Sequence, residues 1–233
     1  MPYLFEPPSC PTLPILGRDA LFPVRRIFCV GRNYAEHARE MGAHDQANGL
    51  EPPFFFTKPG DALIGGLGEL AVHYPPMTGN LHHEVEMVAA LGAGGADVST
   101  DQALSLVAAY GVGLDLTRRD LQAQAKAKGH PWDMGKGFDQ SAVCGALQLV
   151  EEIGHPDHGE IWLKVNGEVR QRGDLGDMGW KVADIVSNLS RLVCLAPGDL
   201  IYTGTPAGVG PLLRGDRLEA GVAGLAELRA HIV

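Results

Sequence analysis

The sequence NLHHEVEMVAAL, residues 80–91, sets four titratable side chains at the start of an apolar run. The run predicts a strand from Leu81 to Leu91, and side chains two residues apart share one face of a strand. Glu84 and Glu86 therefore point the same way, as does His82. Two neighbouring carboxylates repel each other, and a divalent cation such as Mg²⁺ or Mn²⁺ removes that penalty. The alternative is a solvated face on which charged residues alternate with valines.

A second strand carries another carboxylate. Asp115 lies inside the apolar sequence GVGLDL, residues 111–116, where a carboxylate is costly unless it is paired or bound to a metal. With Glu84 and Glu86 it supplies the third oxygen ligand of an open octahedral site, whose remaining positions would hold substrate and water. The alternative for Asp115 is a buried side chain that caps a neighbouring loop or helix.

Short strand patterns outnumber helical ones along the rest of the chain. Glycine and proline number 31 and 16 among 233 residues, which fits many tight turns and argues against a fold of long helices. Asn166-Gly167 is the preferred two-residue turn of a β-hairpin. Further strands are expected at residues 27–31, 54–57, 161–165, 168–170 and 200–203. The prediction is an α+β, mostly-β single domain over residues 25–233, with the proline-containing residues 1–24 as an arm lying on it.

Helical signals occur at four places. They are a short helix capped by Asn33 with Glu36, a helix over about 100–109 with Ser99 and Gln102 as capping box, a helix capped by Thr117 and ended by Gly129, and an amphipathic helix over 182–193. The strands and helices do not alternate as in a doubly wound fold. The glycine-rich strings do not match GxGxxG opening a helix, so a dinucleotide site is not expected.

Composition excludes two classes of partner. The chain has 28 acidic and 19 basic residues, a formal net charge of −9, which argues against binding to nucleic acid phosphates. No apolar stretch approaches the roughly 20 residues of a membrane helix. The N-terminus lacks a basic region and is broken by prolines, unlike a secretory signal. The four cysteines lie far apart, which favours a reduced, cytoplasmic protein.

The short helix after residue 31 carries a candidate general base. His37 and Glu40 are three residues apart and therefore share one helix face. A carboxylate that orients an imidazole is a recurring general-base arrangement. The alternative is a solvated helix with mixed charges.

Three cations stand beside glycine- or proline-rich turns, namely Arg32, Lys58 and Lys136. Each is a candidate for binding a substrate carboxylate or a developing oxyanion, and each has the alternative of a surface charge. The turn TGTPAG, residues 203–208, is either a backbone nest for an anion or a plain tight turn.

These segments, in this order, resemble the fumarylacetoacetate hydrolase family, most of all its small single-domain bacterial members of the fumarylpyruvate hydrolase type. The resemblance runs from about residue 27 to the C-terminus. It rests on GRNYAEHAREM at 31–41, FFFTKP at 54–59, NLHHEVEMV at 80–88, GVGLDLTRRDLQ at 111–122, PWDMGKGFD at 131–139, IWLKVNGEVRQ at 161–171 and GDLIYTGTPAGVGP at 198–211. It implies a mixed β-sandwich roll with a few short helices, and a homodimer.

The resemblance also assigns roles to individual positions. It implies that Glu84, Glu86 and Asp115 hold Mg²⁺ or Mn²⁺, and that His37 and Glu40 activate a water molecule on a segment that orders as a lid. The polar, glycine-containing segment from residue 41 to residue 53 is a candidate mobile loop. Lys136 is implied to face the substrate and its oxyanion. Two further positions match substrate-binding ones, Gln122 and Thr205.

The implied reaction is metal-dependent hydrolysis of a carbon–carbon bond in a small-molecule 2,4-dioxo acid, such as fumarylpyruvate to fumarate and pyruvate in aromatic degradation by the gentisate route. The metal would chelate the 1-carboxylate and 2-oxo group while activated water attacks the C4 carbonyl. The same metal site suits other substrates. The alternatives are an oxaloacetate decarboxylase, an acylpyruvase, or an isomerase and decarboxylase of a homoprotocatechuate-pathway dioxo acid. A metal- or ligand-binding protein without catalysis is a further class.

Overall fold

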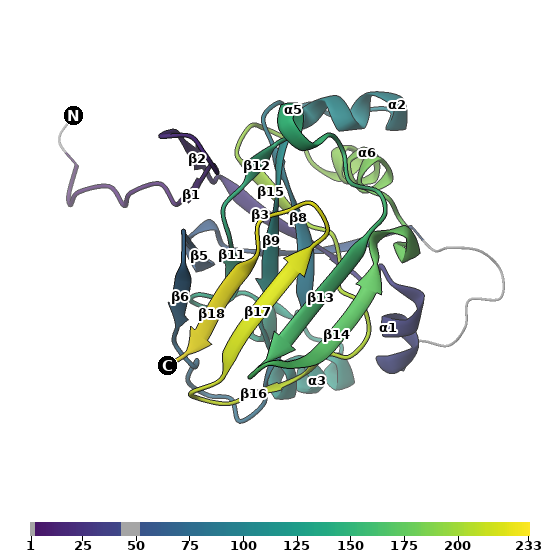
Figure 1. Ribbon diagram of the computed structural model, residues 1–233. Coiled ribbons are helices and arrows are strands. Elements are labelled where there is room, and N and C mark those ends of the chain that lie inside the picture. The colour runs from purple at the N-terminus through teal and green to yellow at the C-terminus, as the bar shows by residue number, and fades with distance from the viewer. Residues whose placement is uncertain (1–2, 43–51) are drawn as a thin grey trace.

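The structure is a computed structural model that describes residues 3–42 and 52–233. Two mixed β-sheets pack face to face at its centre (Figure 1). The larger sheet contains, in spatial order, β4 (Phe54–Lys58), β3 (Arg26–Gly31), β15 (Asp199–Tyr202), β8 (Val85–Leu91), β9 (Val107–Asp115), β11 (Ala142–Cys144) and β5 (Leu63–Gly65), with β12 (Gln148–Leu149) paired to β9.

Three smaller sheets complete the strands. The five-stranded one contains β14 (Glu168–Asp174), β13 (Glu160–Val165), β17 (Arg217–Val222), β18 (Leu228–Ile232) and β6 (Glu69–Val72). The three-stranded one contains β10 (Thr117–Arg118), β7 (Leu81–His83) and β16 (Gly210–Leu212), and the two-stranded one β1 (Thr12–Pro14) and β2 (Leu21–Pro23). The eight-stranded sheet and the five-stranded sheet each contain a parallel pair of strands. The predicted mixed, mostly-β architecture is therefore confirmed.

The helices are short and lie at the edges of the sheets. They are α1 (Ala35–Glu40), α2 (Thr100–Ala103), α3 (Arg119–Lys128), α4 (Asp133–Lys136), α5 (Val150–Ile153) and α6 (Val182–Leu192), with 3₁₀ turns at Gly60–Ala62, Leu104–Leu106 and Leu175–Asp177. Within residues 3–42 and 52–233, no helix combines the length and apolar character needed to cross a bilayer.

Alternation along β8 divides the core into two. Met87 and Ala89 face the cluster between the two large sheets, whereas Val88 and Ala90 face a second cluster on the opposite side of the larger sheet. The hairpin β1–β2 covers that second side, with Leu13 and Phe22 buried in it. Figure 1 shows the segment before β1 extending away from the body.

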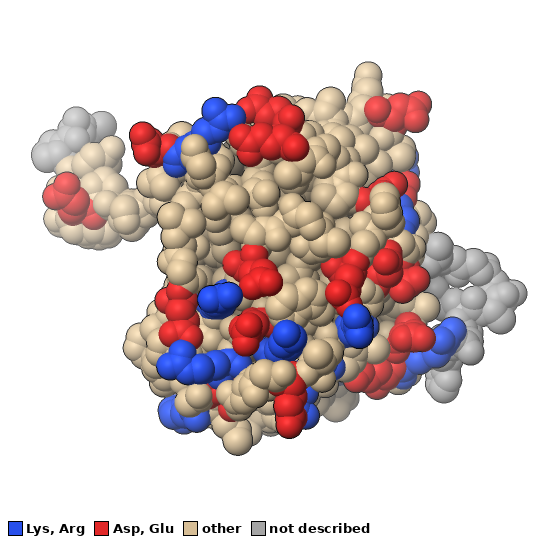
Figure 2. All heavy atoms as spheres, viewed as in Figure 1, with Lys and Arg blue, Asp and Glu red and all other residues tan. Residues whose placement is uncertain are grey.

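The outer face of the five-stranded sheet is solvated. Figure 2 shows positive and negative side chains interspersed on it. Several form ion pairs, such as Arg172 with Glu160 and Arg217 with Glu69. The predicted hairpin lies here and is confirmed. Its turn has positive φ at both central positions, +52° at Asn166 and +82° at Gly167, as this type of turn requires.

The expected single strand over residues 81–91 is in fact two strands. It breaks at Glu84, because β7 pairs with β10 and β16 while β8 pairs with β15 and β9. The chain therefore passes from one sheet to another at this glutamate. Alternation predicts the apolar faces of β8 correctly but cannot show that the run switches sheets.

Two predicted helices differ from the structure in their bounds or caps. The helix expected over 100–109 ends at Ala103, because Val107 and the residues after it pair with β8. Its N-cap residue Ser99 makes no side-chain cap hydrogen bond. Thr117 belongs to β10, and its helix begins at Arg119. The helix does end at Gly129, whose φ of +65° is the left-handed cap conformation.

Asn33 is not a helix cap. Tyr34 takes the N-cap position of α1, and the buried Asn33 amide joins three chain segments instead. Its Nδ2 donates to the carbonyl oxygens of Trp180 (2.9 Å) and Thr203 (2.7 Å), and its Oδ1 accepts from Trp180 N (2.8 Å). The amide thus ties the end of β3 to the loop after the 3₁₀ turn Leu175–Asp177 and to the loop after β15.

We expect Asn33→Ala to lower the free energy of unfolding by roughly 2–5 kcal/mol, because it leaves buried backbone groups without partners. Urea denaturation measures the change. Asn188→Ala is the matched control, since that amide makes one hydrogen bond to Asp184 O in a partly exposed helix position. Equal effects of the two substitutions would contradict the role given to Asn33.

Candidate active site

Three buried carboxylates meet at one end of the larger sheet. Glu84, Glu86 and Asp115 are at most 4% exposed, and each offers an oxygen within 4.8 Å of the others. The strand register explains the meeting. Glu86 stands opposite Gly113 in the antiparallel pair of β8 and β9, so Asp115, two residues further, shares its face of the sheet. Asp115 N also donates to Glu84 O at 2.9 Å.

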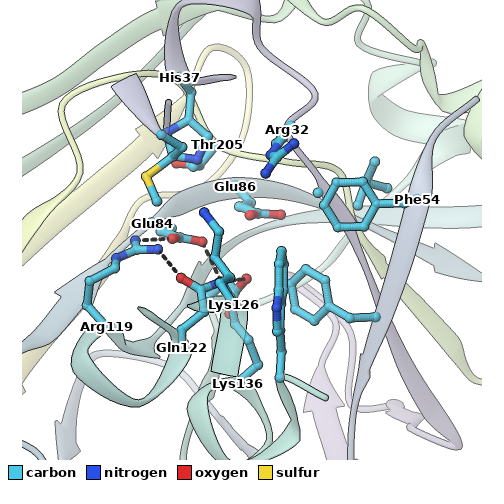
Figure 3. A pocket seen from close by; sticks show the side chains of 16 residues that line it. Arg32, His37, Phe54, Glu84, Glu86, Arg119, Gln122, Lys126, Lys136 and Thr205 are labelled. Atoms are coloured by element: carbon cyan, nitrogen blue, oxygen red, sulfur yellow. Dashed lines mark hydrogen bonds and ion pairs between the residues drawn. The ribbon is translucent and has the colours of Figure 1, made fainter. Parts of the chain in front are cut away.

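Three cations surround two of these carboxylates. Lys136 Nζ lies 2.7 Å from both Glu84 Oε2 and Asp115 Oδ2. Lys58 Nζ lies 2.7 Å from Asp115 Oδ1, and Arg119 pairs with Glu84. Figure 3 shows Arg119 and Lys136 beside Glu84. Burial alone would raise the pKa of Glu84, but Lys136 and Arg119 hold it well below its usual range.

Glu86 has the opposite balance of charges. Burial raises its pKa, and the neighbouring carboxylates of Asp115 and Glu84 raise it further. Gly204 N donates to Glu86 Oε2 at 2.7 Å, but none of the described lysines or arginines forms an ion pair with it. A divalent cation would supply the positive charge that Glu86 lacks. The all-oxygen donor set therefore fits Mg²⁺ or Mn²⁺.

His37 and Glu40 are in contact on α1. His37 Nδ1 lies 3.2 Å from Glu40 Oε2, and Gly208 N donates to the same carboxylate at 3.2 Å. His37 is buried, and burial is the main reason that its pKa lies below the ordinary value, despite the opposing effect of Glu84 and Glu40. The imidazole is therefore neutral at pH 7.

The turn after β15 binds two side-chain carboxylates of the site through its backbone amides. Its amides at Gly204 and Gly208 donate to Glu86 and Glu40 respectively. Both glycines have positive φ, +99° and +94°, and a Cβ on Gly208 would stand 2.3 Å from Arg170 O. The turn therefore supplies two separate backbone donors, each to a different carboxylate of the site, rather than one nest for a single anion.

A partly open pocket lies over the carboxylates and His37. Arg32, Gln122 and Thr205 line it, as does Lys136. Gln171 Nε2 donates to Thr205 Oγ1 at 2.8 Å, which leaves the threonine hydroxyl proton free to point elsewhere. The glutamines are buried and Arg32 is exposed.

Lys58 does not line this pocket, and its expected role in substrate binding does not fit its position. The side chain is buried, and its ammonium contacts Asp115 and donates to Leu116 O and Lys136 O. Its three donors are therefore used inside the protein. Lys58 is placed as a counter-ion of Asp115.

Sequence reasoning missed other lining residues. Arg119 bridges Glu84 and Gln122, donating to Gln122 Oε1 at 2.6 Å. Lys126, Phe54 and Trp132 also line the pocket. A signal for Arg119 existed, since it lies four residues after Asp115, at the start of the next helix. His82, expected beside the glutamates, contacts Asn80 and Arg119 instead and is not in the carboxylate cluster. Of the expected mobile loop over 41–53, residues 43–51 lie outside the described part of the chain.

A family model for the C-terminal part of fumarylacetoacetate (FAA) hydrolase matches residues 26–233. The chain belongs to this family. Among family members, it is 43% identical to the fumarylpyruvate hydrolase of Ralstonia sp over 77% of this chain and 92% of that protein. It is 40% identical to the mitochondrial oxaloacetate tautomerase of Arabidopsis thaliana, over 89% and 90% of the two chains.

A crystal structure from the fumarylacetoacetate hydrolase family has the same fold. The fumarylpyruvate hydrolase of Pseudomonas aeruginosa, solved in complex with Mn²⁺ and pyruvate, is 50% identical and superposes with a TM-score of 0.96. The match covers 100% of this chain and 99% of that one, so it includes the arm before residue 25.

Proposed function

We propose that the protein is a metal-dependent hydrolase that cleaves the C3–C4 bond of a 2,4-dioxo acid, with fumarylpyruvate as substrate and fumarate and pyruvate as products. The observation that carries this proposal is the shared pocket: a neutral, carboxylate-oriented histidine faces the same cavity as three clustered carboxylates. The relatives from Ralstonia sp and Pseudomonas aeruginosa, both named fumarylpyruvate hydrolase, support it.

Glu84, Glu86 and Asp115 would hold a Mg²⁺ or Mn²⁺ ion, and the Mn²⁺ of the Pseudomonas aeruginosa complex supports this assignment. When bound, such an ion supplies a Lewis acid for the oxygens of a 2-oxo acid. The protein's own contribution is to hold the three oxygens together in a buried place, against their mutual repulsion.

His37 acts as the base. With Glu40 accepting the hydrogen bond from Nδ1, the lone pair on Nε2 is free to take a proton from water. The resulting hydroxide attacks C4. Gly208 N holds the Glu40 carboxylate, so the orientation of the imidazole is fixed by the turn after β15.

Lys136 faces the charge that develops on the C4 oxygen. Burial opposes its charged form, but Asp115 and Glu84 raise its pKa to about 12, so the ammonium remains protonated. It stabilises the oxyanion electrostatically. Collapse of the oxyanion breaks the C3–C4 bond and releases fumarate and the enolate of pyruvate, which takes up a proton at C3.

The direct test uses protein stripped with EDTA. Loss of the enol-diketone absorbance of fumarylpyruvate is followed with and without added Mg²⁺ or Mn²⁺, and pyruvate is measured enzymatically. We expect metal-dependent loss with one pyruvate formed per substrate. No loss, with oxaloacetate transformed under the same conditions, would overturn the hydrolase.

A second candidate is enolate chemistry on oxaloacetate, by tautomerisation or decarboxylation. The 40% identity to a protein named oxaloacetate tautomerase favours it. That chemistry uses the carboxylate cluster but requires no attacking water. Acylpyruvates and homoprotocatechuate-pathway dioxo acids are substrates of the same kind. The His37–Glu40 pair distinguishes hydrolysis of any of these dioxo acids from tautomerisation or decarboxylation, because only hydrolysis needs it to activate water.

The pH dependence of hydrolysis is expected to reflect His37. Glu84, Glu40 and Arg119 are the charged groups around it, and burial dominates the net lowering of its pKa. Since the neutral imidazole is the active form, activity falls only when the pH drops below that lowered pKa. We expect the acid limb of the kcat profile to lie below pH 6.5, the ordinary value. A limb centred above pH 6.5 would contradict the assignment.

We also propose that the enzyme works as a cytoplasmic homodimer in the gentisate route of aromatic degradation. The family resemblance supports the dimer, and the substrate supports the route. Size-exclusion chromatography with light scattering measures the molecular mass in solution. A monomeric mass would contradict the proposed dimer.

A further inference from the structure

One wall of the pocket is aromatic. Phe54 and Phe56 on β4 both contact Trp132. Their ring centroids lie 5.6 and 6.1 Å, respectively, from the Trp132 ring centroid. All three line the cavity, and we call them the aromatic wall. Flat apolar faces of this kind suit a planar, conjugated chain better than a bulky or strongly hydrated group.

The pocket also holds two cations that no described carboxylate neutralises. Lys58, Lys136 and Arg119 are paired with Asp115 and Glu84. Arg32 and Lys126 line the same cavity, but neither forms an ion pair with an acidic side chain of residues 3–42 and 52–233 (Figure 3). Away from the carboxylate cluster, the pocket therefore carries an excess of positive charge.

Both side chains line the pocket, Arg32 from the residue after β3 and Lys126 from α3. Arg32 has a φ of +57°, a left-handed conformation that is uncommon for a residue other than glycine and that concentrates at functional sites. Its guanidinium lies 5.8 Å from the centre of the Phe54 ring. Lys126 follows Gln122 by four residues on α3, so the two share the helix face that lines the cavity.

The two cations repel each other. Burial lowers the pKa of Lys126, and Arg32 and Arg119 lower it further. An anion placed between Arg32 and Lys126 would relieve this repulsion and would be bound by charge-assisted hydrogen bonds.

We propose that Arg32 and Lys126 form a carboxylate subsite for the far end of the acyl group, with the aromatic wall alongside the chain that leads to it. The substrate class is then a 2,4-dioxo acid whose planar acyl chain ends in a second carboxylate. This assignment rests on the proposed function, because it concerns the other end of the same substrate. Acylpyruvates whose acyl group lacks this second carboxylate are poorer substrates.

The kinetic test compares fumarylpyruvate with acetylpyruvate, which has a methyl group in place of the charged chain. Arg32→Asn removes the charge and keeps a residue that tolerates positive φ, and Lys126→Gln removes the second charge. In each variant we expect the ratio of kcat/KM for fumarylpyruvate to that for acetylpyruvate to fall about tenfold or more. Lys128→Gln, an exposed lysine on the same helix outside the pocket lining, should leave the ratio unchanged.

A binding test is independent of turnover. Isothermal titration calorimetry compares fumarate with crotonate, in which a methyl group replaces one carboxylate. Wild-type protein should prefer fumarate by about tenfold, and Arg32→Asn and Lys126→Gln should each reduce that preference. Equal binding of the two acids by the wild type, or an unchanged preference in both variants, would overturn the subsite.

The two tests separate the subsite from the proposed function. If dioxo acids are cleaved but neither ratio responds to the substitutions, the subsite is wrong and the hydrolase stands. If no dioxo acid is cleaved while the fumarate preference depends on Arg32 and Lys126, the hydrolase is wrong and the carboxylate subsite stands.

Discussion

Glu86→Gln is expected to abolish tight binding of Mg²⁺ or Mn²⁺ and to reduce hydrolysis by about 1,000-fold or more, because a Lewis acid contributes several kcal/mol to the barrier. Glutamine keeps the shape of the side chain and an oxygen that accepts from Gly204 N. The loss would therefore come from the charge. Calorimetric titration with Mn²⁺ and the rate on fumarylpyruvate measure the two effects.

The metal-free protein provides the control for folding. The pKa of Glu86 is raised by burial and by Asp115 and Glu84. A raised folded-state pKa means that the ionised side chain costs stability as the pH rises through that value. At pH 7, Glu86→Gln without metal should therefore melt no lower than the wild type, while the rise in Tm on adding Mn²⁺ should vanish. A variant that kept both metal binding and turnover would contradict the assignment of the cluster.

His37→Ala is expected to leave metal binding intact and to slow hydrolysis by about 100- to 10,000-fold, the usual contribution of a positioned base. The side chain lies on α1, outside the carboxylate cluster, and its hydrogen-bond partner is Glu40. The acid limb of the pH profile should disappear with it. Single-turnover rates on fumarylpyruvate, together with Mn²⁺ titration, measure the separation.

The same variant tests the second candidate function. If the natural reaction is enolate chemistry on oxaloacetate, His37→Ala should retain activity on oxaloacetate. In that case neither the wild type nor the variant should cleave fumarylpyruvate. Unchanged hydrolysis of fumarylpyruvate in His37→Ala would remove the histidine from the role of base. Glu40→Gln should give a smaller loss, since it weakens the orientation of the imidazole but keeps the ring.

The metal cluster was accessible from sequence because it depends on local periodicity. Glu86 and Asp115 lie on regular strands, and alternation places each on a defined face. Their meeting depends on the register of β8 and β9, which one sequence does not contain. The mixed β fold and the family were both predicted from the ordered motifs. The sheets and the match to a solved structure confirm the fold, and the family model over residues 26–233 confirms the family.

The errors in the sequence analysis come from tertiary contacts. Asparagine is a residue type that often caps helices, but the Asn33 amide instead binds two loops that are distant in sequence. Its partners Trp180 and Thr203 lie 147 and 170 residues further along the chain. The helix after Ser99 ends at Ala103 instead of near residue 109, because the chain forms β9 from Val107 onward. Lys58 looked like a free cation beside a turn, yet it is buried against Asp115. Lys126 has no local feature that separates it from Lys128, the other lysine of the same helix.

Hydrolysis by this protein requires that the oxygen of water enters the acyl product. Metal-loaded enzyme is given fumarylpyruvate in water enriched in ¹⁸O, and the fumarate is analysed by mass spectrometry, with unreacted substrate as the control for carbonyl exchange. We expect fumarate that carries one ¹⁸O more than the residual substrate's acyl group. Formation of no fumarate, or of fumarate without the added label, would contradict attack of water at C4.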